Sequence, residues 1–131
     1  MKEYDGRVRL IFKDRPLPSH ALARPAHEAA RCAGAKGKYW EYHDLLFEEQ
    51  PAFEREDLLL YAGEVGLDKI EFARCLDERR FAADVETDLK QALALGITGT
   101  PTLLVNGRLI VGAPPIEEFR SIIELALKGH R

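Results

Sequence analysis

The sequence predicts an α/β fold from three observations. Residues 7–13 alternate polar and apolar side chains, a period of two that indicates a β-strand. Near the C-terminal end, Asn106-Gly107 separates two short apolar runs, and this dipeptide is the strongest short-range signal for a hairpin turn. Between these two regions, apolar residues recur at helical spacing. The expected order is therefore one strand, four or five helices, two strands and a last helix.

Glycine and proline mark where the predicted helices stop. Each helical segment has an apolar stripe at a spacing of three to four residues, and Asp68 followed by Glu71 has the pattern of a helix-capping box. Pro115 suits the first position of the final helix. The helices are expected at residues 21–35, 38–50, 55–65, 69–76, 81–95 and 115–127. The stripe Tyr39, Trp40 and Phe47 in the second of these is expected to pack in the core.

Composition bounds the class of protein. The chain has 131 residues, enough for one domain with a real core, and its net charge is −3 with both signs mixed along the sequence. No basic run suggests nucleic acid as a partner, and no apolar stretch approaches the roughly 20 residues of a membrane span. The first six residues have no apolar signal-peptide segment, so a cytoplasmic location is expected for the chain as given.

The turn before the predicted hairpin is the first candidate site. Gly99, Thr100 and Pro101 form a tight turn, with Pro101 at the first strand position, where its missing N–H does least harm. For an X-Pro bond the cis form costs only about 0.5–1 kcal/mol more than the trans form. We expect a cis bond before Pro101.

Two segments resemble one family. Residues 96–112, from Gly96 through the turn to Gly112, are similar to the cis-proline loop and C-terminal hairpin of the DsbA family of thiol-disulfide oxidoreductases. Residues 37–47 look like the first helix of that family's helical insertion. The resemblance implies a thioredoxin-like α/β fold over residues 1–131 as a single domain, with a helical insertion at about 21–95. It also implies that Gly99, Thr100 and Pro101 bind extended, thiol-containing peptides.

The chain departs from that family at the redox motif. The only cysteines are Cys32 and Cys75, so no Cys-x-x-Cys is present and no residue is assigned a catalytic role. The resemblance then describes a form truncated at the N-terminus, inactive by itself, without the family's first strand. That strand would lie between residues 8–12 and 102–105. Either those two segments pair directly, or a neighbouring chain covers the opening, and we therefore predict a homodimer or larger homo-oligomer.

Two other functions stay open. The chain could be a non-catalytic protein that binds peptides or assembles with itself. It could also belong to the glutathione-dependent isomerase and transferase branch of the same fold, in which glutathione is the cofactor. The interpretation of the chain as a thiol-disulfide oxidoreductase requires no cofactor.

Cysteine and histidine chemistry has competing interpretations. Cys32 and Cys75 fall within predicted helices, away from the N-terminal position that lowers a thiol pKa, so both are expected either as small buried apolar residues or as a structural disulfide. The disulfide is suggested because related proteins often carry cysteines at both positions. The histidines are not at metal-ligand spacing, and no metal site is expected; they are His20, His27, His43 and His130.

Overall fold

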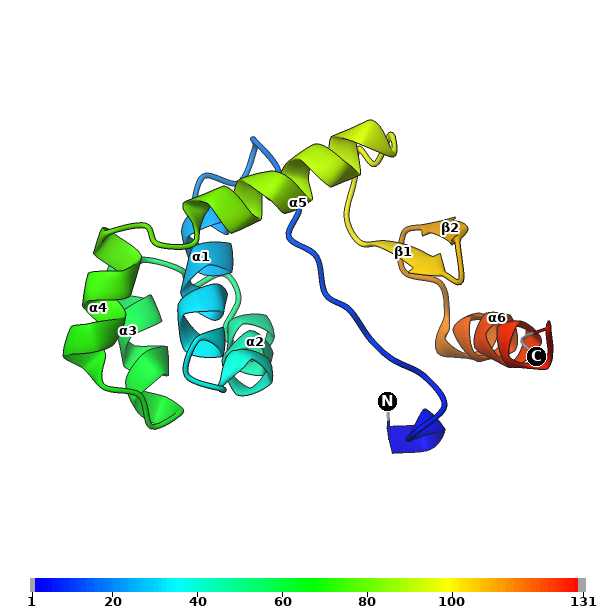
Figure 1. Ribbon diagram of the computed structural model, residues 1–131, viewed down its shortest axis with the longest axis horizontal. Coiled ribbons are helices and arrows are strands. Elements are labelled where there is room, and N and C mark those ends of the chain that lie inside the picture. The colour runs from blue at the N-terminus through cyan, green and yellow to red at the C-terminus, as the bar shows by residue number, and fades with distance from the viewer. Residues whose placement is uncertain (1, 130–131) are drawn as a thin grey trace. The chain divides into compact units, whose positions relative to one another are not determined.

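The structure, a computed structural model, describes residues 2–129 and contains six α-helices and one two-stranded sheet (Figure 1). The chain divides into two compact units. One unit is Asp14–Gln91, and the other combines the N-terminal segment up to Lys13 with the chain from Ala92 onward. The single domain expected for residues 1–131 stays a prediction.

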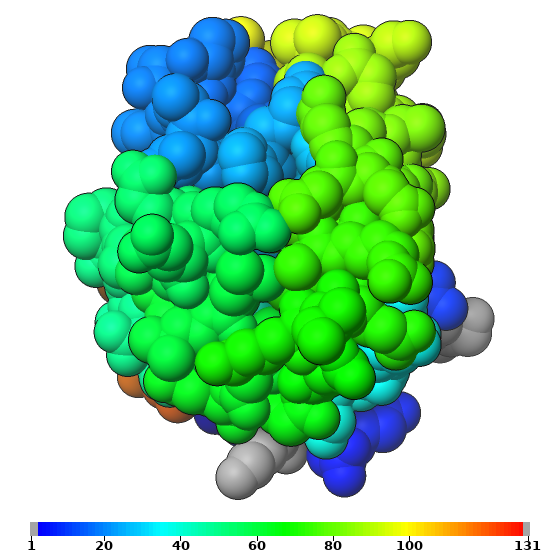
Figure 2. All heavy atoms as spheres, turned by 90° about the vertical axis from the view of Figure 1, so that its left-hand side faces the viewer, coloured from blue at the N-terminus to red at the C-terminus, as the bar shows by residue number. Residues whose placement is uncertain are grey.

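Helices dominate the Asp14–Gln91 unit. They are α1 (Ala23–Gly34), α2 (Tyr39–Glu48), α3 (Arg55–Glu64), α4 (Lys69–Asp77) and most of α5 (Ala82–Ala94). Helix α1 packs against α2, α3 and α4. Alanine side chains are small, so they let the neighbouring helices approach α1 closely, and Ala29 and Ala33 are both completely buried. Helices α3 and α4 also contact each other, and the green atoms of this part of the chain cover much of the face in Figure 2.

The core of this unit is aromatic and aliphatic. Tyr42 of α2 is completely buried, and its hydroxyl donates a hydrogen bond of 2.8 Å to the carbonyl of Leu58. Phe72 of α4 lies against the Tyr42 ring, with 5.4 Å between ring centroids. Burying each of these side chains contributes on the order of 2 kcal/mol, and the hydrogen bond removes the penalty of burying a hydroxyl.

Two helices of this unit, α3 and α4, begin with a carboxylate cap. The Asp68 side chain accepts hydrogen bonds from the backbone N–H groups of Ile70 and Glu71, as the sequence predicted. A capping box that the sequence analysis missed opens α3, where Glu54 and Asp57 satisfy each other's backbone N–H groups. Each such cap satisfies donors that the first turn of a helix otherwise leaves unpaired.

The second unit contains the hairpin. Strand β1 (Thr102–Val105) pairs antiparallel with β2 (Arg108–Val111), and the closing pair is Val105 with Arg108. Asn106 and Gly107 both have positive φ, 48° and 86°, as a type I′ turn requires. Helix α6 (Ile116–Gly129) packs against β1, and Ile122 and Ile123 are its buried residues. The N-terminal segment of this unit contains a short 3₁₀ helix, η1 (Lys2–Tyr4).

The strand predicted at residues 7–13 is wrong. Residues 8–17 form neither helix nor strand, and the sheet of the described chain contains β1 and β2 alone. Leu10 and Ile11 are 46% and 57% exposed. An alternating pattern becomes a strand only when a neighbouring strand accepts its hydrogen bonds. Of the two alternatives expected for residues 8–12, direct pairing with residues 102–105 does not occur, and cover by a neighbouring chain stays a prediction.

The expected burial of the aromatic stripe on α2 is wrong for Trp40 and Phe47, whereas Tyr39 does pack against the core. Trp40 and Phe47 are 42% and 57% exposed, and Tyr39 is half-buried. The reason is that Tyr42, on another face of the same helix, fills the core position instead.

None of the helices within residues 2–129 is both long and apolar enough to cross a bilayer.

Candidate functional site

The turn at residues 99–101 leads directly into β1. Thr100 and Pro101 are exposed, and the hydroxyl of Thr102 donates a hydrogen bond of 2.7 Å to the carbonyl of Gly99, which closes the turn. The peptide bond between Thr100 and Pro101 is cis, the geometry we expected, and the bond between Gln50 and Pro51 is cis as well. The turn is therefore a defined, solvent-accessible entrance to the strand.

One edge of β1 is open. The Gly112 N–H donates to the Pro101 carbonyl at 2.9 Å, which continues the ladder between the strands by one residue. In an antiparallel pair, alternate residues direct their backbone groups toward the partner strand. Pro101, Leu103 and Val105 face β2 in this register, so the backbone groups of Thr102 and Leu104 point to the opposite edge. Within residues 2–129 no strand pairs with that edge.

The two cysteines form a disulfide between α1 and α4. Cys32 and Cys75 are 4% and 6% exposed, and their Cα atoms are 6.1 Å apart. Of the two interpretations, the structural disulfide is confirmed, and the burial expected under the other interpretation is also observed. Neither is a thiol available for exchange in this structure.

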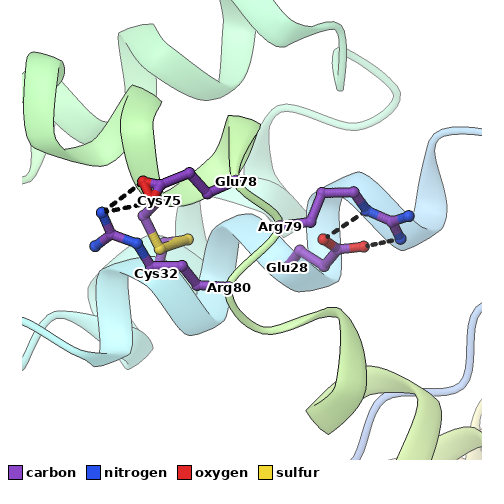
Figure 3. Close-up of a disulfide and its surroundings, with 6 residues drawn as sticks. All are labelled: Glu28, Cys32, Cys75, Glu78, Arg79 and Arg80. Carbon is purple, nitrogen blue, oxygen red and sulfur yellow. Dashed lines mark hydrogen bonds and ion pairs between the residues drawn. A yellow bond between two sulfur atoms is a disulfide. The ribbon is translucent and has the colours of Figure 1, made fainter.

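Two ion pairs flank this disulfide (Figure 3). The Arg79 guanidinium bonds both carboxylate oxygens of Glu28, at 2.8 and 3.2 Å, and Glu28 is only 3% exposed. Arg80 pairs with Glu78 on the exposed side, with a shortest distance of 3.0 Å. The buried carboxylate of Glu28 is therefore compensated by a bidentate cation, the geometry that best offsets the cost of its burial.

A buried charge cluster ties three parts of the helical unit together. Asp14 is 1% exposed, and its two carboxylate oxygens lie 2.9 Å from His27 Nδ1 and 2.6 Å from Arg31 Nε. Arg31 Nη2 also bonds Asp88 of α5 at 2.6 Å, and the Asp14 N–H donates to the same Asp88 oxygen at 2.9 Å. We define these four residues, Asp14, His27, Arg31 and Asp88, as the Asp14 cluster.

The electrostatics of the Asp14 cluster favour its charged form. Burial acts to raise the pKa of Asp14, but the hydrogen bonds and charges of His27 and Arg31 outweigh it and hold that pKa below its usual range. On α2, burial raises the pKa of Tyr39, and the negative charge of Asp14 adds to the effect. The sequence analysis missed this cluster, because no local pattern connects residues 14, 27, 31 and 88.

Histidines and carboxylates do not gather as metal ligands in the described part of the chain, where no group of three such side chains could hold an ion. His27 and His43 are half-buried on α1 and α2, and His20 is exposed. His130 lies outside the described residues. The structure therefore separates these histidines: His27 belongs to the Asp14 cluster, and His43 lies among aromatic rings of α2.

The fold and the site together define a class of protein. A helical unit, a C-terminal hairpin entered through an exposed Thr-Pro turn, and a final helix against that hairpin form an α/β protein of the thioredoxin-like class. The chain belongs to the thioredoxin family, because the family model described as Thioredoxin matches residues 1–125. A solved structure agrees: a thioredoxin-like oxidoreductase from Silicibacter pomeroyi superposes with a TM-score of 0.84 at 26% identity, over 98% of this chain and 73% of that one.

Sequence relatives carry two kinds of name. A protein named Na(+)/H(+) antiporter NhaA 1 from Salinispora arenicola is 38% identical over 125 residues, which are 95% of this chain and 19% of that protein. Disulfide bond formation protein D from Bacillus subtilis is 31% identical over 99 residues, 70% of this chain and 44% of that protein. The chain therefore spans about a fifth of the antiporter relative and less than half of the disulfide-forming relative.

Proposed function

We propose that this chain is the substrate-binding part of a thiol-disulfide oxidoreductase of the DsbA type, with residues 99–101 and the open edge of β1 as its peptide site. The observation that carries the proposal is the continuity of these two features. The exposed turn Gly99-Thr100-Pro101 runs into a strand whose outward backbone groups, on Thr102 and Leu104, are available to an extended peptide. Adding a strand at such an edge is a recurrent mode of peptide recognition.

Thiol-disulfide exchange also needs a nucleophile. A thiolate attacks one sulfur of a disulfide, forms a mixed disulfide with it and releases the other sulfur as a thiolate. Cys32 and Cys75 are bonded to each other and buried, so the proposal assigns them a structural role. The proposal therefore needs an attacking thiolate and a resolving thiol that this chain does not supply, and it assigns no exchange activity to the chain by itself.

A titration with a blocked peptide tests the binding site. The probe is an eight-residue extended peptide with a central S-methylated cysteine, followed by amide chemical shifts of the isotope-labelled chain. We expect saturable shifts at Thr100, Thr102 and Leu104. Leu104→Pro removes an outward N–H without breaking the ladder to β2 and should weaken binding about tenfold, whereas Leu109→Pro, its counterpart on the other edge, should not. Shifts confined to β2, or equal effects of both variants, would contradict the proposal.

An insulin-reduction assay tests the assigned inactivity. With both cysteines in a buried disulfide, the chain should show no turnover above the background of dithiothreitol. Turnover that disappears in the Cys32→Ala variant would show that this pair is catalytic and would overturn the structural assignment.

The same edge supports a second candidate, self-association. Strand β1 contains no charged residue, and charge is a common protection of exposed edges. Two copies paired antiparallel about Leu103 would bond Thr102 of one copy to Leu104 of the other, and conversely. Leu103 would then lie opposite Leu103 of the second copy, at a Cα separation of about 4.5 Å.

No observation in the described residues favours the glutathione-dependent branch.

Cysteine crosslinking tests this second candidate. Leu103→Cys should give a disulfide-linked dimer on mild oxidation, and the unmodified chain should have twice its 14.8 kDa mass in solution. Leu109→Cys is the matched control, since three strand spacings of about 4.8 Å would separate its two copies. A monomeric mass, or equal crosslinking of both variants, would rule out pairing through β1.

A further inference from the structure

Helix α2 has three distinct faces. Its buried face carries Tyr42 and the half-buried Leu45 and Leu46. With about 100° between successive residues, the adjacent face carries four ring-bearing side chains, and the face beyond it carries acids. The ring-bearing residues, which we define as the α2 aromatic face, are Tyr39, Trp40, His43 and Phe47. The acidic residues are Glu41, Asp44 and Glu48.

The rings of the α2 aromatic face form a continuous row. Trp40 contacts Tyr39 and His43 edge-to-face, each with 5.2 Å between centroids, and His43 contacts Phe47 at 4.6 Å. This row orders the side chains before any partner arrives, which lowers the entropic cost of binding. Two of its members are nevertheless well exposed, Trp40 at 42% and Phe47 at 57%. Large aromatic side chains in such positions are typical centres of binding surfaces.

The border of this face is negatively charged. The side chain of Asp44 is 69% exposed, although one of its oxygens lies 3.1 Å from His43 Nδ1, and Glu48 is exposed one turn further along. The chain continues with further acids up to α3: Glu49, Glu54, Glu56 and Asp57. The cations nearby are already engaged, because Lys38 pairs with Glu41 at 3.5 Å and Arg55 bonds Asp77 of α4 through two hydrogen bonds. Negative charge on Asp44 and Glu48 therefore lies beside the exposed rings on α2, and the segment that follows α2 is also acidic.

We propose that the α2 aromatic face binds a basic amphipathic polypeptide segment. The apolar stripe of that segment packs on Trp40 and Phe47, and its lysine or arginine side chains reach Asp44 and Glu48. Charge complementarity selects this partner, because an acidic segment would be repelled by Asp44 and Glu48 and an uncharged one would gain no attraction from them. A guanidinium or ammonium group over the Trp40 ring adds a cation–π attraction. The proposal is independent of the peptide site at residues 99–101.

The chain supplies its own reporter, because Trp40 is its single tryptophan. The probe is a 14-residue peptide of leucine and lysine arranged at helical spacing. Titration should shift the Trp40 emission to shorter wavelength in a saturable way, with an affinity that falls as salt is added. Two control peptides, one with glutamate in place of lysine and one with serine in place of leucine, should bind at least tenfold more weakly.

Matched variants locate the surface. Phe47→Ala should weaken binding about tenfold or more, whereas Ile70→Ala, which truncates a side chain 74% exposed on α4, should leave it unchanged. Asp44→Asn should reduce the salt dependence, and Glu64→Gln on α3 should not. Far-UV circular dichroism confirms that each variant is folded. The proposal is overturned if the glutamate peptide binds equally well, if Phe47→Ala and Ile70→Ala behave alike, or if Trp40 emission responds only to anionic lipid vesicles.

Discussion

At the scale of single residues, Asp14 carries the clearest pH dependence. Its carboxylate is buried against His27 and Arg31, and its pKa lies below the unfolded value of about 3.9. A depressed pKa means that the folded state binds the proton less tightly than the unfolded state. The stabilisation from Asp14 is therefore complete above the unfolded pKa and is lost as the pH falls from there through the lower folded pKa.

The Asp14→Asn variant tests this dependence. Loss of charge-assisted hydrogen bonds to Arg31 should lower the free energy of unfolding by about 1–3 kcal/mol at pH 7. The difference from the unmodified chain should shrink below pH 4, as measured by urea denaturation across pH. Asp44→Asn, at a carboxylate 69% exposed, should change stability little at either pH. A difference that does not vary with pH would mean that Asp14 acts through packing alone.

The Asp14 cluster also marks what residue patterns cannot predict. Its members occupy positions 14, 27, 31 and 88, and the contact between Asp14 and Asp88 spans 74 positions of sequence. Nothing local distinguishes these aspartates from solvated ones. The cysteines differ, because a buried apolar position was predicted for each from its helix, and only their pairing depended on the resemblance to a family.

At the scale of elements, capping by Asp68 is a local feature that the sequence predicted and the structure contains. Its side chain accepts from the N–H groups of Ile70 and Glu71 at 2.9 and 3.1 Å. Asp68→Ala should destabilise α4 by about 1 kcal/mol, because these donors lose their acceptor. Asp68→Asn keeps an acceptor and should cost only a few tenths of that, as thermal unfolding can measure. Equal losses in the two variants would argue against a capping role.

Helices and the hairpin were predictable because their signals are local. A 3.6-residue stripe with glycine or proline at its ends located every helix to within two or three residues, and Asn106-Gly107 located the turn. The segment at residues 7–13 failed because a strand depends on a neighbour that its own sequence does not supply. The predicted burial of Trp40 and Phe47 failed for a related reason, since helical spacing indicates a stripe without deciding which of two stripes faces the core.

At the scale of the whole molecule, the disulfide and the proposed peptide site belong to different units. The disulfide and the Asp14 cluster lie in Asp14–Gln91, whereas the proposed peptide site lies with the hairpin in the other unit. Membership of the thioredoxin family fixes the fold, and the proposed function follows from the open edge of β1. The helical unit is closed covalently by the disulfide between Cys32 and Cys75, and its stability can be tested separately.

Removing the disulfide should destabilise one unit selectively. Cys32 and Cys75 are 43 positions apart, and closing a loop of that length restricts the unfolded chain by an amount worth about 4 kcal/mol. The Cys32→Ala/Cys75→Ala variant should therefore lose about 2–4 kcal/mol in the Asp14–Gln91 unit. Hydrogen exchange measures this residue by residue: amides of α1 and α4 should exchange faster, by a factor of at least about 30 at the lower bound. Amides of α6, in the unit without cysteines, should keep their protection. Equal acceleration in α6 would show that the two units unfold as one cooperative body, and no acceleration in α1 would show that the disulfide does not stabilise the helices it joins.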